Sequence, residues 1–270
     1  MPSYDIRTLQ LHILEILSVV DRVCKDNNIR YYIVDGTMLG AIRHKGFIPW
    51  DDDIDVGIPR KDYEFFIKNA EKWLPKPYEL ICAENDTNYP FPFAKVQDSN
   101  TTLIERKSMK YLGGVYIDIF PLDGVPDNKI MQKIHFAKYQ YYKKILYYTY
   151  RDPYKHGKGI HSWIPLLCRK IFKFANTQKH TRELLRKYDY DESTYCANFD
   201  DGSKSIMHKD VLGIPTPVPF EDRIVMGVEK YDIYLKTIYG NYMQIPSVEN
   251  QKMHNFYYLD LNKPYRNHQL

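Results

Sequence analysis

The sequence has little of several features that each mark a particular class of protein. Its 270 residues contain only four cysteines, with no CxxC pair and no zinc-ligand spacing. A disulfide framework or a structural zinc site is therefore not expected, and we interpret the thiols as the reduced cysteines of a cytoplasmic protein. No uncharged apolar run approaches the roughly 20 residues of a membrane span. The opening MPSYDIRTLQLHI contains no signal-peptide apolar region.

Neither sign of charge is in large excess. The chain has 38 basic and 34 acidic side chains, a formal net charge of +4, which is too small to indicate nucleic acid binding. Apolar residues make up 44% and charged residues 27%, the proportions of a chain that can bury a core. The one excess is 25 tyrosines against 12 phenylalanines. Tyrosine suits half-wet clefts and membrane interfaces, although a lineage bias toward tyrosine explains the count equally well.

Apolar periodicity divides the chain into three parts. Residues 1–126 alternate helical and strand patterns, residues 127–190 are helical and rich in Lys and Tyr, and residues 191–270 mix short strands with a helix over about 223–239. We expect an α+β fold, with a mixed β-sheet core flanked by helices, a helical insertion, and a C-terminal segment that completes the core. The expected strands are 29–34, 54–58, 78–83, 93–96, 101–104 and 115–120; helices are expected over 4–27 and 62–73 and in a segment capped by Thr37.

Four carboxylates fall within five positions of the segment WDDDIDV, residues 50–56. In an extended strand alternate side chains share a face, so Asp51, Asp53 and Asp55 would point the same way. Three like charges on one face repel unless a cation lies among them. Because hard oxygen ligands suit Mg²⁺ or Mn²⁺, which also bind phosphates, this pattern favours a metal and phosphate site.

Two other interpretations of this cluster stay open. A solvated acidic turn is one, but the apolar residues between the acids fit a buried strand better. A calcium loop is the other, but Val56 stands where its glycine should be, and the twelfth position is Asp62 rather than Glu.

Two flanking features support the metal-phosphate hypothesis. Gly36 permits close backbone approach, and the hydroxyl of Thr37 at a helix start can meet a phosphate. Asp118 lies in the alternating segment VYIDIF, where a carboxylate is costly to bury unless it binds a metal or a partner. A salt-bridged buried acid is the alternative interpretation of Asp118.

The run DGTMLGAIRHKGFIPWDDDIDVGIPRKDYEFF, residues 35–66, resembles the signature of the LicD family. These are bacterial phosphocholine transferases related to the fukutin group of ribitol-phosphate transferases. The resemblance continues in FAKVQDSNTT, VYIDIFPLDG and YDIYLKTIYGNYMQIP. The sequence differs from the family pattern at Met226-Gly227-Val228, just before the last of these blocks, where a segment with proline is expected. It implies a nucleotidyltransferase-like fold, CDP-choline as donor, and a sugar hydroxyl of a teichoic acid or lipopolysaccharide as acceptor.

The resemblance also implies roles for single residues. Asp53, Asp55 and Asp118 match the catalytic and metal-binding acids of the fold, and Asp118 or another acid would accept the hydroxyl proton. The substrate-binding candidates are Gly36, Thr37, Arg43, Lys45, Asp51, Lys95 and His254. Arg43, Lys45 and Lys95 are equally well explained as ordinary cations, and His254 as a structural histidine.

Choline is a quaternary ammonium group, which proteins commonly hold in an aromatic cage. Four aromatic residues lie near the motifs in sequence, and each is also explained as packing: Trp50, Tyr89, Tyr111 and Tyr116. The sequence does not distinguish among them, nor between choline and ribitol as the transferred alcohol.

A second amphipathic segment lies in the helical part. Within residues 160–174 one helical face collects Ile160, Trp163, Ile164, Leu167, Ile171 and Phe174, with His161, Arg169, Lys170 and Lys173 nearby. This pattern is typical of a helix on an anionic bilayer, close to a lipid-linked acceptor, and would make the protein peripheral at the inner face of the membrane. The alternative is a helix packed on its own core.

Three other functions remain open. An Asp-x-Asp glycosyltransferase explains the acids but not the Gly-Thr turn in that order. A true nucleotidyltransferase would leave the nucleotide on the acceptor, and a non-enzymatic nucleotide sensor would keep the fold without the reaction.

Overall fold

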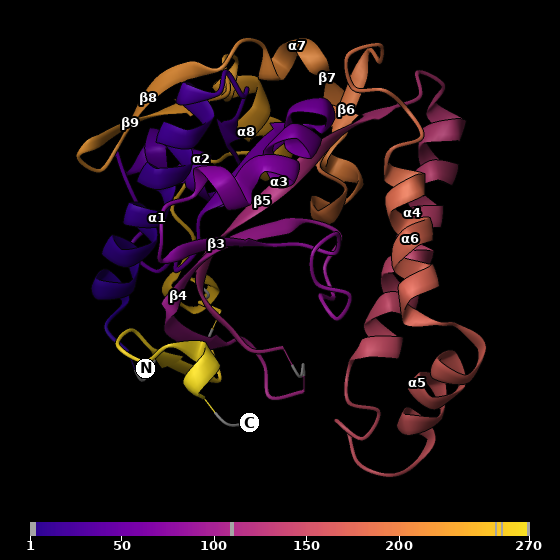
Figure 1. Ribbon diagram of the computed structural model, residues 1–270. Helices are drawn as coiled ribbons and strands as arrows, with labels where there is room; N and C mark the ends of the chain where they lie inside the picture. The colour runs from indigo at the N-terminus through magenta and orange to yellow at the C-terminus, as the bar shows by residue number, and fades with distance from the viewer. Residues whose placement is uncertain (1–3, 109–110, 252, 255, 269–270) are drawn as a thin grey trace.

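A mixed β-sheet runs through the centre of the molecule (Figure 1). The computed structural model describes residues 4–108, 111–251, 253–254 and 256–268. Its strand order is β1-β2-β5-β4-β10, and β2 runs parallel to β5, whereas the other neighbours on this path are antiparallel. The bounds are β1 (Tyr32–Ile33), β2 (Asp55–Pro59), β4 (Ala94–Ile104), β5 (Gly113–Val125) and β10 (Tyr258–Asp260). Strand β3 (Tyr78–Ile81) also pairs with β4, and β6 (Tyr195–Ala197) joins the end of β5 to β7 (Met207–His208).

Helices and a hairpin cover this sheet. The apolar stripe of α1 (Ile6–Asp26) is buried in the main core, as its periodicity predicts. The remaining elements of this part are α2 (Asp35–Arg43), α3 (Arg60–Trp73), α7 (Lys209–Leu212), α8 (Tyr231–Tyr239), the hairpin β8 (Thr216–Phe220) and β9 (Arg223–Gly227), and the short 3₁₀ turns Phe199–Asp201, Ser203–Ser205, Val248–Asn250 and Tyr265–Asn267.

Three helices form a lobe between β5 and β6. They are α4 (Lys129–Tyr150), α5 (Ile160–Ile171) and α6 (Phe174–Leu185). In Figure 1, α4 and α6 lie side by side and α5 lies at the far end of the lobe. A second apolar cluster, consisting of Val125, Tyr139, Leu185, Ala197 and Phe199, packs α4 and α6 against the ends of β5 and β6. No helix in the described part of the chain is long and apolar enough to cross a bilayer.

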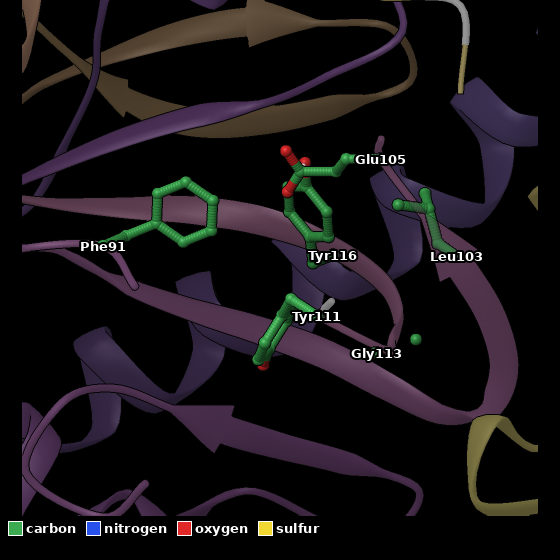
Figure 2. Close-up of a pocket in the computed structure, with 7 residues that line it drawn as sticks. Phe91, Leu103, Glu105, Tyr111, Gly113 and Tyr116 are labelled. Carbon is green, nitrogen blue, oxygen red and sulfur yellow. The ribbon is translucent and has the colours of Figure 1, made fainter. Parts of the chain in front are cut away.

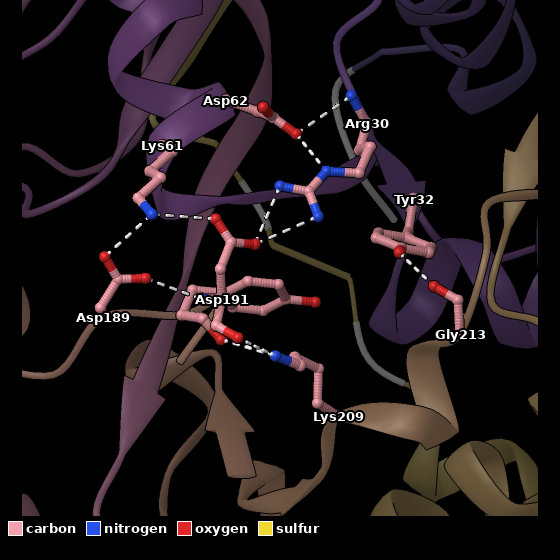
Figure 3. Close-up of polar contacts among 9 residues, drawn as sticks. Arg30, Tyr32, Lys61, Asp62, Asp189, Asp191, Lys209 and Gly213 are labelled. Carbon is pink, nitrogen blue, oxygen red and sulfur yellow. Dashed lines mark hydrogen bonds and ion pairs between the residues drawn. The ribbon is translucent and has the colours of Figure 1, made fainter. Parts of the chain in front are cut away.

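An ion network fastens the end of the lobe to the core (Figure 3). Arg30 pairs with Asp62 at 2.6 Å and with Asp191 at 3.2 Å. Lys61 pairs with Asp189 at 3.0 Å and with Asp191 at 3.3 Å. The chain that returns from α6 is thereby held against the start of α3.

The α+β prediction is confirmed, but several element boundaries differ from expectation. Residues 223–227 form β9 instead of the start of a helix, because Ile224 and Val225 favour a strand and β8 supplies its partner. The two strands expected over 93–96 and 101–104 are one continuous strand, β4. Its register with β5 shifts after Asp98, as at a β-bulge, but the strand continues to Ile104.

Two helix starts also differ. Helix α2 begins at Asp35 after Val34, without a side-chain cap, so Thr37 is not the cap. Helix α5 ends at Ile171 and Phe174 opens α6, so Phe174 does not share a helical face with Trp163 and Leu167.

Candidate active site

Three charged residues lie in one row across the centre of the sheet. Asp55 on β2 is the register partner of Asp118 on β5, and Asp118 is in turn the register partner of Lys95 on β4. Partners in adjacent strands point to the same face. The parallel pairing of β2 and β5 therefore brings together two of the three acids predicted to act, although 63 residues separate them in the sequence.

Lys95 neutralises part of this row from inside the protein. Only 2% of its surface is exposed, and its Nζ lies 2.8 Å from Asp118 Oδ1 and 3.1 Å from Glu105 Oε1. Tyr116 OH donates a hydrogen bond of 2.8 Å to Glu105. Although burial acts in the opposite direction, the charge of Lys95 and this hydrogen bond lower the pKa of Glu105. Lys95 is thus an internal counter-ion for two carboxylates.

Strand β2 begins at Asp55, one residue later than expected. Asp51 and Asp53 precede it in an irregular segment, so the alternation of a strand does not place them on the same face as Asp55. Burial first, and then the charge of Asp53, raise the pKa of Asp51 to about 9. Burial, followed by repulsion from Asp53, Asp35 and Asp118, raises the pKa of Asp55 well above its ordinary value. Burial also raises the pKa of Asp118, to about 7, against the opposing charge of Lys95. The acids therefore interact strongly as a group.

The Gly-Thr turn fits closely against these acids. A Cβ on Gly36 would lie 2.9 Å from Asp51 Oδ2, so a side chain there would displace that carboxylate. The hydroxyl of Thr37 accepts a hydrogen bond of 2.8 Å from the backbone N–H of Asp55. Thr37 thereby fixes the start of β2, while its own hydroxyl proton is available for donation.

The structure adds a second acidic group that the motifs did not identify. Asp35 is buried in a left-handed conformation with φ of 49°, and Asn198 Nδ2 donates to Asp35 at 3.4 Å and to Asp201 at 2.7 Å. Burial and the neighbouring Asp35 raise the pKa of Asp201 to about 10. Tyr234 OH also donates to Asp35, at 3.2 Å. No local sequence pattern pointed to this group, because only the fold brings Asp35 and Asp201 together through Asn198.

His254 connects the C-terminal segment to the acidic loop. Its Nδ1 lies 2.6 Å from Asp52 and its Nε2 lies 3.6 Å from Asp53. The hydrogen bond with Asp52 is the main cause that raises the pKa of His254 to about 9. Tyr4 OH donates to the same Asp52 at 2.7 Å. His254 therefore lies at the edge of the site, with Asp52 as its principal partner.

The other two predicted cations are not gathered into this row. Arg43 Nη1 donates to the backbone carbonyl of Tyr242 at 2.8 Å, which joins α2 to the segment after α8. Lys45 lies in the loop after α2, with an exposed side chain and a positive φ of 65°. Among the described contacts, no ion pair joins either cation to Asp53, Asp55 or Asp118.

A small cavity of about 10 Å³ lies beside Lys95 and is lined by Phe91, Leu103, Glu105, Tyr111, Gly113, Gly114 and Tyr116 (Figure 2). That volume accommodates about one water molecule. Lys95 Nζ lies over the ring of Tyr116, 3.2 Å from its centroid. The aromatic groups here thus already hold a cation, which belongs to the protein. Of the other cage candidates, Tyr89 packs on Tyr111 and Phe91, and Trp50 packs on His44.

The donor chemistry of the site suits a divalent cation. Asp53, Asp55 and Asp118 offer hard carboxylate oxygens, and their repulsion is of the kind that a bound cation relieves. However, no group of three or more His, Cys, Asp or Glu side chains in the described residues is already arranged around a metal position. Binding would thus require side-chain rotation or ligands from a substrate.

Comparison with known proteins gives a consistent family match. A family model for the LicD/FKTN/FKRP nucleotidyltransferase domain matches residues 28–165. That range contains the Gly-Thr turn and the acids on β2 and β5, whereas His254 lies outside it.

Individual relatives extend the match. The lipopolysaccharide cholinephosphotransferase LicD of Haemophilus influenzae is 30% identical over 262 residues, which cover 94% of this chain and 97% of that protein. Ribitol-5-phosphate transferase FKTN of Mus musculus is 31% identical over 108 residues, 39% of this chain and 20% of that protein. Human ribitol 5-phosphate transferase FKRP is 28% identical over 105 residues, 39% of this chain and 19% of that protein.

Proposed function

The chain belongs to the LicD/FKTN/FKRP family of transferases, and on this basis we propose that it moves phosphocholine from CDP-choline to a sugar hydroxyl of a cell-surface glycan precursor. The relative that matches over nearly the whole chain is named a lipopolysaccharide cholinephosphotransferase, which favours choline over ribitol. The acceptor would be a lipopolysaccharide or teichoic acid precursor. The register pairing of Asp55 with Asp118 is the observation that carries the proposal, because it places two acids of separate motifs side by side.

The reaction is a substitution at the phosphorus that bears choline. The sugar hydroxyl oxygen forms a bond to this phosphorus, the bond to the bridging oxygen breaks, and CMP leaves with that oxygen. Such transfers depend mainly on positioning and charge neutralisation. Gly36 and Thr37 would receive the donor phosphates, since the Thr37 hydroxyl can donate a proton. The Asp51 carboxylate, which lies against Gly36, would have to move aside to admit a phosphate.

Asp53, Asp55 and Asp118 would hold Mg²⁺ or Mn²⁺. When bound, the ion would neutralise charge on the donor diphosphate. Asp118 is also our candidate to accept the proton from the acceptor hydroxyl, because its carboxylate lies beside Asp55 in the central row. Lys95 would hold the Asp118 side chain in place and favour its ionised form.

The test measures CMP release with CDP-choline and a glycan acceptor, and identifies the modified glycan by mass spectrometry. Asp53→Asn, Asp55→Asn and Asp118→Asn should each lower turnover about a hundredfold or more while the thermal unfolding curve keeps its shape. Asp222→Asn, at an exposed position in the β8–β9 turn, is the matched control and should keep its rate. A near-normal rate in Asp53→Asn or Asp55→Asn would remove that residue from the mechanism.

A separate experiment tests the identity of the donor. Thermal shifts in the presence of Mg²⁺ should be largest with CDP-choline among CDP-choline, CDP-ribitol, a UDP-sugar and ATP. Stabilisation by the UDP-sugar alone would favour a glycosyltransferase, and a product that retains the nucleotide would indicate a nucleotidyltransferase.

A further inference from the structure

Helix α5 has its apolar and polar faces reversed relative to an ordinary packed helix. Over residues 161–171 the buried side chains are Ser162 and Pro165, and Arg169 on the same face donates to the carbonyls of Thr149 at 3.0 Å and Arg151 at 2.8 Å. The opposite face exposes Trp163 at 71%, Leu167 at 57% and Ile171 at 62% of their surface. Ile164 and Leu166 are exposed as well. The alternative of a helix whose apolar face packs on its own core is therefore wrong, because these large apolar side chains are exposed.

The surroundings of this face are uniformly basic. Residues 153–182 contain seven Lys and Arg side chains and no Asp or Glu. Since the whole chain carries +4, the remaining 240 residues carry −3, so the positive charge of the protein is concentrated in this segment. Within the described residues, no carboxylate forms an ion pair with Lys155, Lys158, Lys170 or Lys173.

We propose that the exposed face of α5 docks on an anionic lipid bilayer. Trp163, Leu167 and Ile171 would enter the boundary between headgroups and acyl chains, where tryptophan is favoured, and the four cations would meet lipid phosphates. Helix α5 lies at the far end of the lobe (Figure 1), and the exposure of Trp163, Leu167 and Ile171 shows that the core does not cover this face. A second copy of the chain is the less suitable occupant, because the same basic segment would then face itself.

Docking of this kind gives the lobe a role that does not depend on which donor the site uses. A glycan precursor carried on a lipid would be confined to the same surface, so a docked enzyme meets it at a high local concentration. The core would remain in the aqueous phase, joined to the membrane only through the tip of the lobe.

The test is flotation of the full chain with vesicles of phosphatidylcholine alone and with vesicles of an equal mixture of phosphatidylcholine and phosphatidylglycerol. We expect binding to the anionic vesicles that weakens as NaCl is added. The double variant Trp163→Glu/Leu167→Glu should lose at least about tenfold in binding. Lys170→Gln and Lys173→Gln should each cost about fivefold at low salt on the anionic vesicles.

The control variant is Ile224→Glu, which replaces one exposed apolar residue on β9 by Glu and so adds one negative charge where the double variant adds two. It should float with the vesicles as the unchanged protein does, and all variants should keep the same thermal shift with CDP-choline. Equal vesicle binding by Trp163→Glu/Leu167→Glu and the unchanged chain would overturn the proposal. The absence of binding to anionic vesicles would overturn it as well. A third contrary outcome is a dimer in sedimentation velocity that the double variant abolishes, with vesicle binding unchanged.

Discussion

Lys95 is the residue whose role can be tested most sharply by stability. Its buried ammonium group is shared by Asp118 and Glu105, so Lys95→Met leaves two enclosed carboxylates without their counter-ion. We expect urea unfolding to show a loss of about 3–5 kcal/mol in the free energy of unfolding. The double variant Lys95→Met/Glu105→Gln should recover part of that loss, because one of the unpaired charges is removed with its partner.

The same variants distinguish the two roles considered for Lys95. As a phosphate contact, Lys95→Met would weaken donor affinity and leave stability unchanged. As an internal counter-ion, it would lower stability in the absence of any donor. Unaltered unfolding with weaker CDP-choline binding would show that the ion pairs matter little.

Thr37 offers a second test at the level of one hydroxyl group. Thr37→Val keeps the shape of the side chain but leaves the partly buried N–H of Asp55 without its acceptor, which should lower the free energy of unfolding by about 1 kcal/mol in urea unfolding. Thr37→Ser retains the hydroxyl and should lose clearly less. If both variants unfold alike, the missing methyl group and not the hydrogen bond is responsible.

Single-residue roles were only partly accessible from the sequence. The acids of the Asp-x-Asp motif and Asp118 could be selected as candidates because a carboxylate is costly to bury among apolar residues, and their roles stay predictions. The sequence did not reveal that Asp35 lies near Asp201 or that Asp52 pairs with His254. In the first case 166 residues separate the two acids, and only the fold joins them through Asn198. The Asp52–His254 contact likewise depends on the fold. Whether Arg43 and Lys45 contact substrate stays a prediction.

At the scale of elements, the packing of α4 depends on a buried histidine. His135 lies between the rings of Tyr188 and Phe199, with centroid distances of 5.0 and 5.2 Å, and its Nε2 has no hydrogen-bond partner in the described structure. Burial is the main cause that lowers the pKa of His135 to about 4, and Lys187 and Lys138 add to it. The folded lobe therefore requires neutral His135.

This requirement makes stability fall in acid. The pKa of His135 is about 6.5 in the unfolded chain and about 4 in the folded chain. Between these values the unfolded chain binds a proton at His135 and the folded chain does not. As the pH drops through this window, the free energy of unfolding therefore decreases by up to about 3 kcal/mol. His135→Phe should remove this slope and be at least as stable near pH 7. Urea unfolding across the window checks it, with exposed His156→Phe as control. A slope that survives in His135→Phe would assign the acid sensitivity elsewhere.

Elements with a long regular pattern were predictable, and those decided by a partner were not. The stripe of α1 and the alternation of VYIDIF correspond to a packed helix and a central strand. Residues 223–227 became a strand because β8 lies beside them, which no local pattern specified. The apolar face of α5 was predicted except for Phe174, which opens α6, but sequence periodicity gives only the direction of an apolar face and not what covers it.

At the scale of the whole molecule, the lobe is an insertion between neighbouring strands. Val125 at the end of β5 is the register partner of Tyr195 at the start of β6, so the chain leaves the sheet and returns to the adjacent position after 69 residues. Both acids of the central row lie before the lobe, and Asn198 and Asp201 lie after it. The division into 1–126, 127–190 and 191–270 stays a prediction, and this topology shows how to test it.

We expect a chain in which a short Gly-Ser linker replaces residues 128–186 to fold, because the two strand ends are already adjacent and the segment 188–191 with its ion pairs is kept. It should unfold at lower temperature, since removal of Tyr139 and Leu185 uncovers Phe199. A companion with Phe199→Ser removes the ring that would promote aggregation. Both should still show the thermal shift with CDP-choline and Mg²⁺, since the acidic row and the Gly-Thr turn are intact, and both should lose vesicle binding. If both chains are soluble and cooperatively folded yet no donor shift remains, the lobe contributes to the donor site. If neither folds, the lobe is part of the core and the three-part division is wrong.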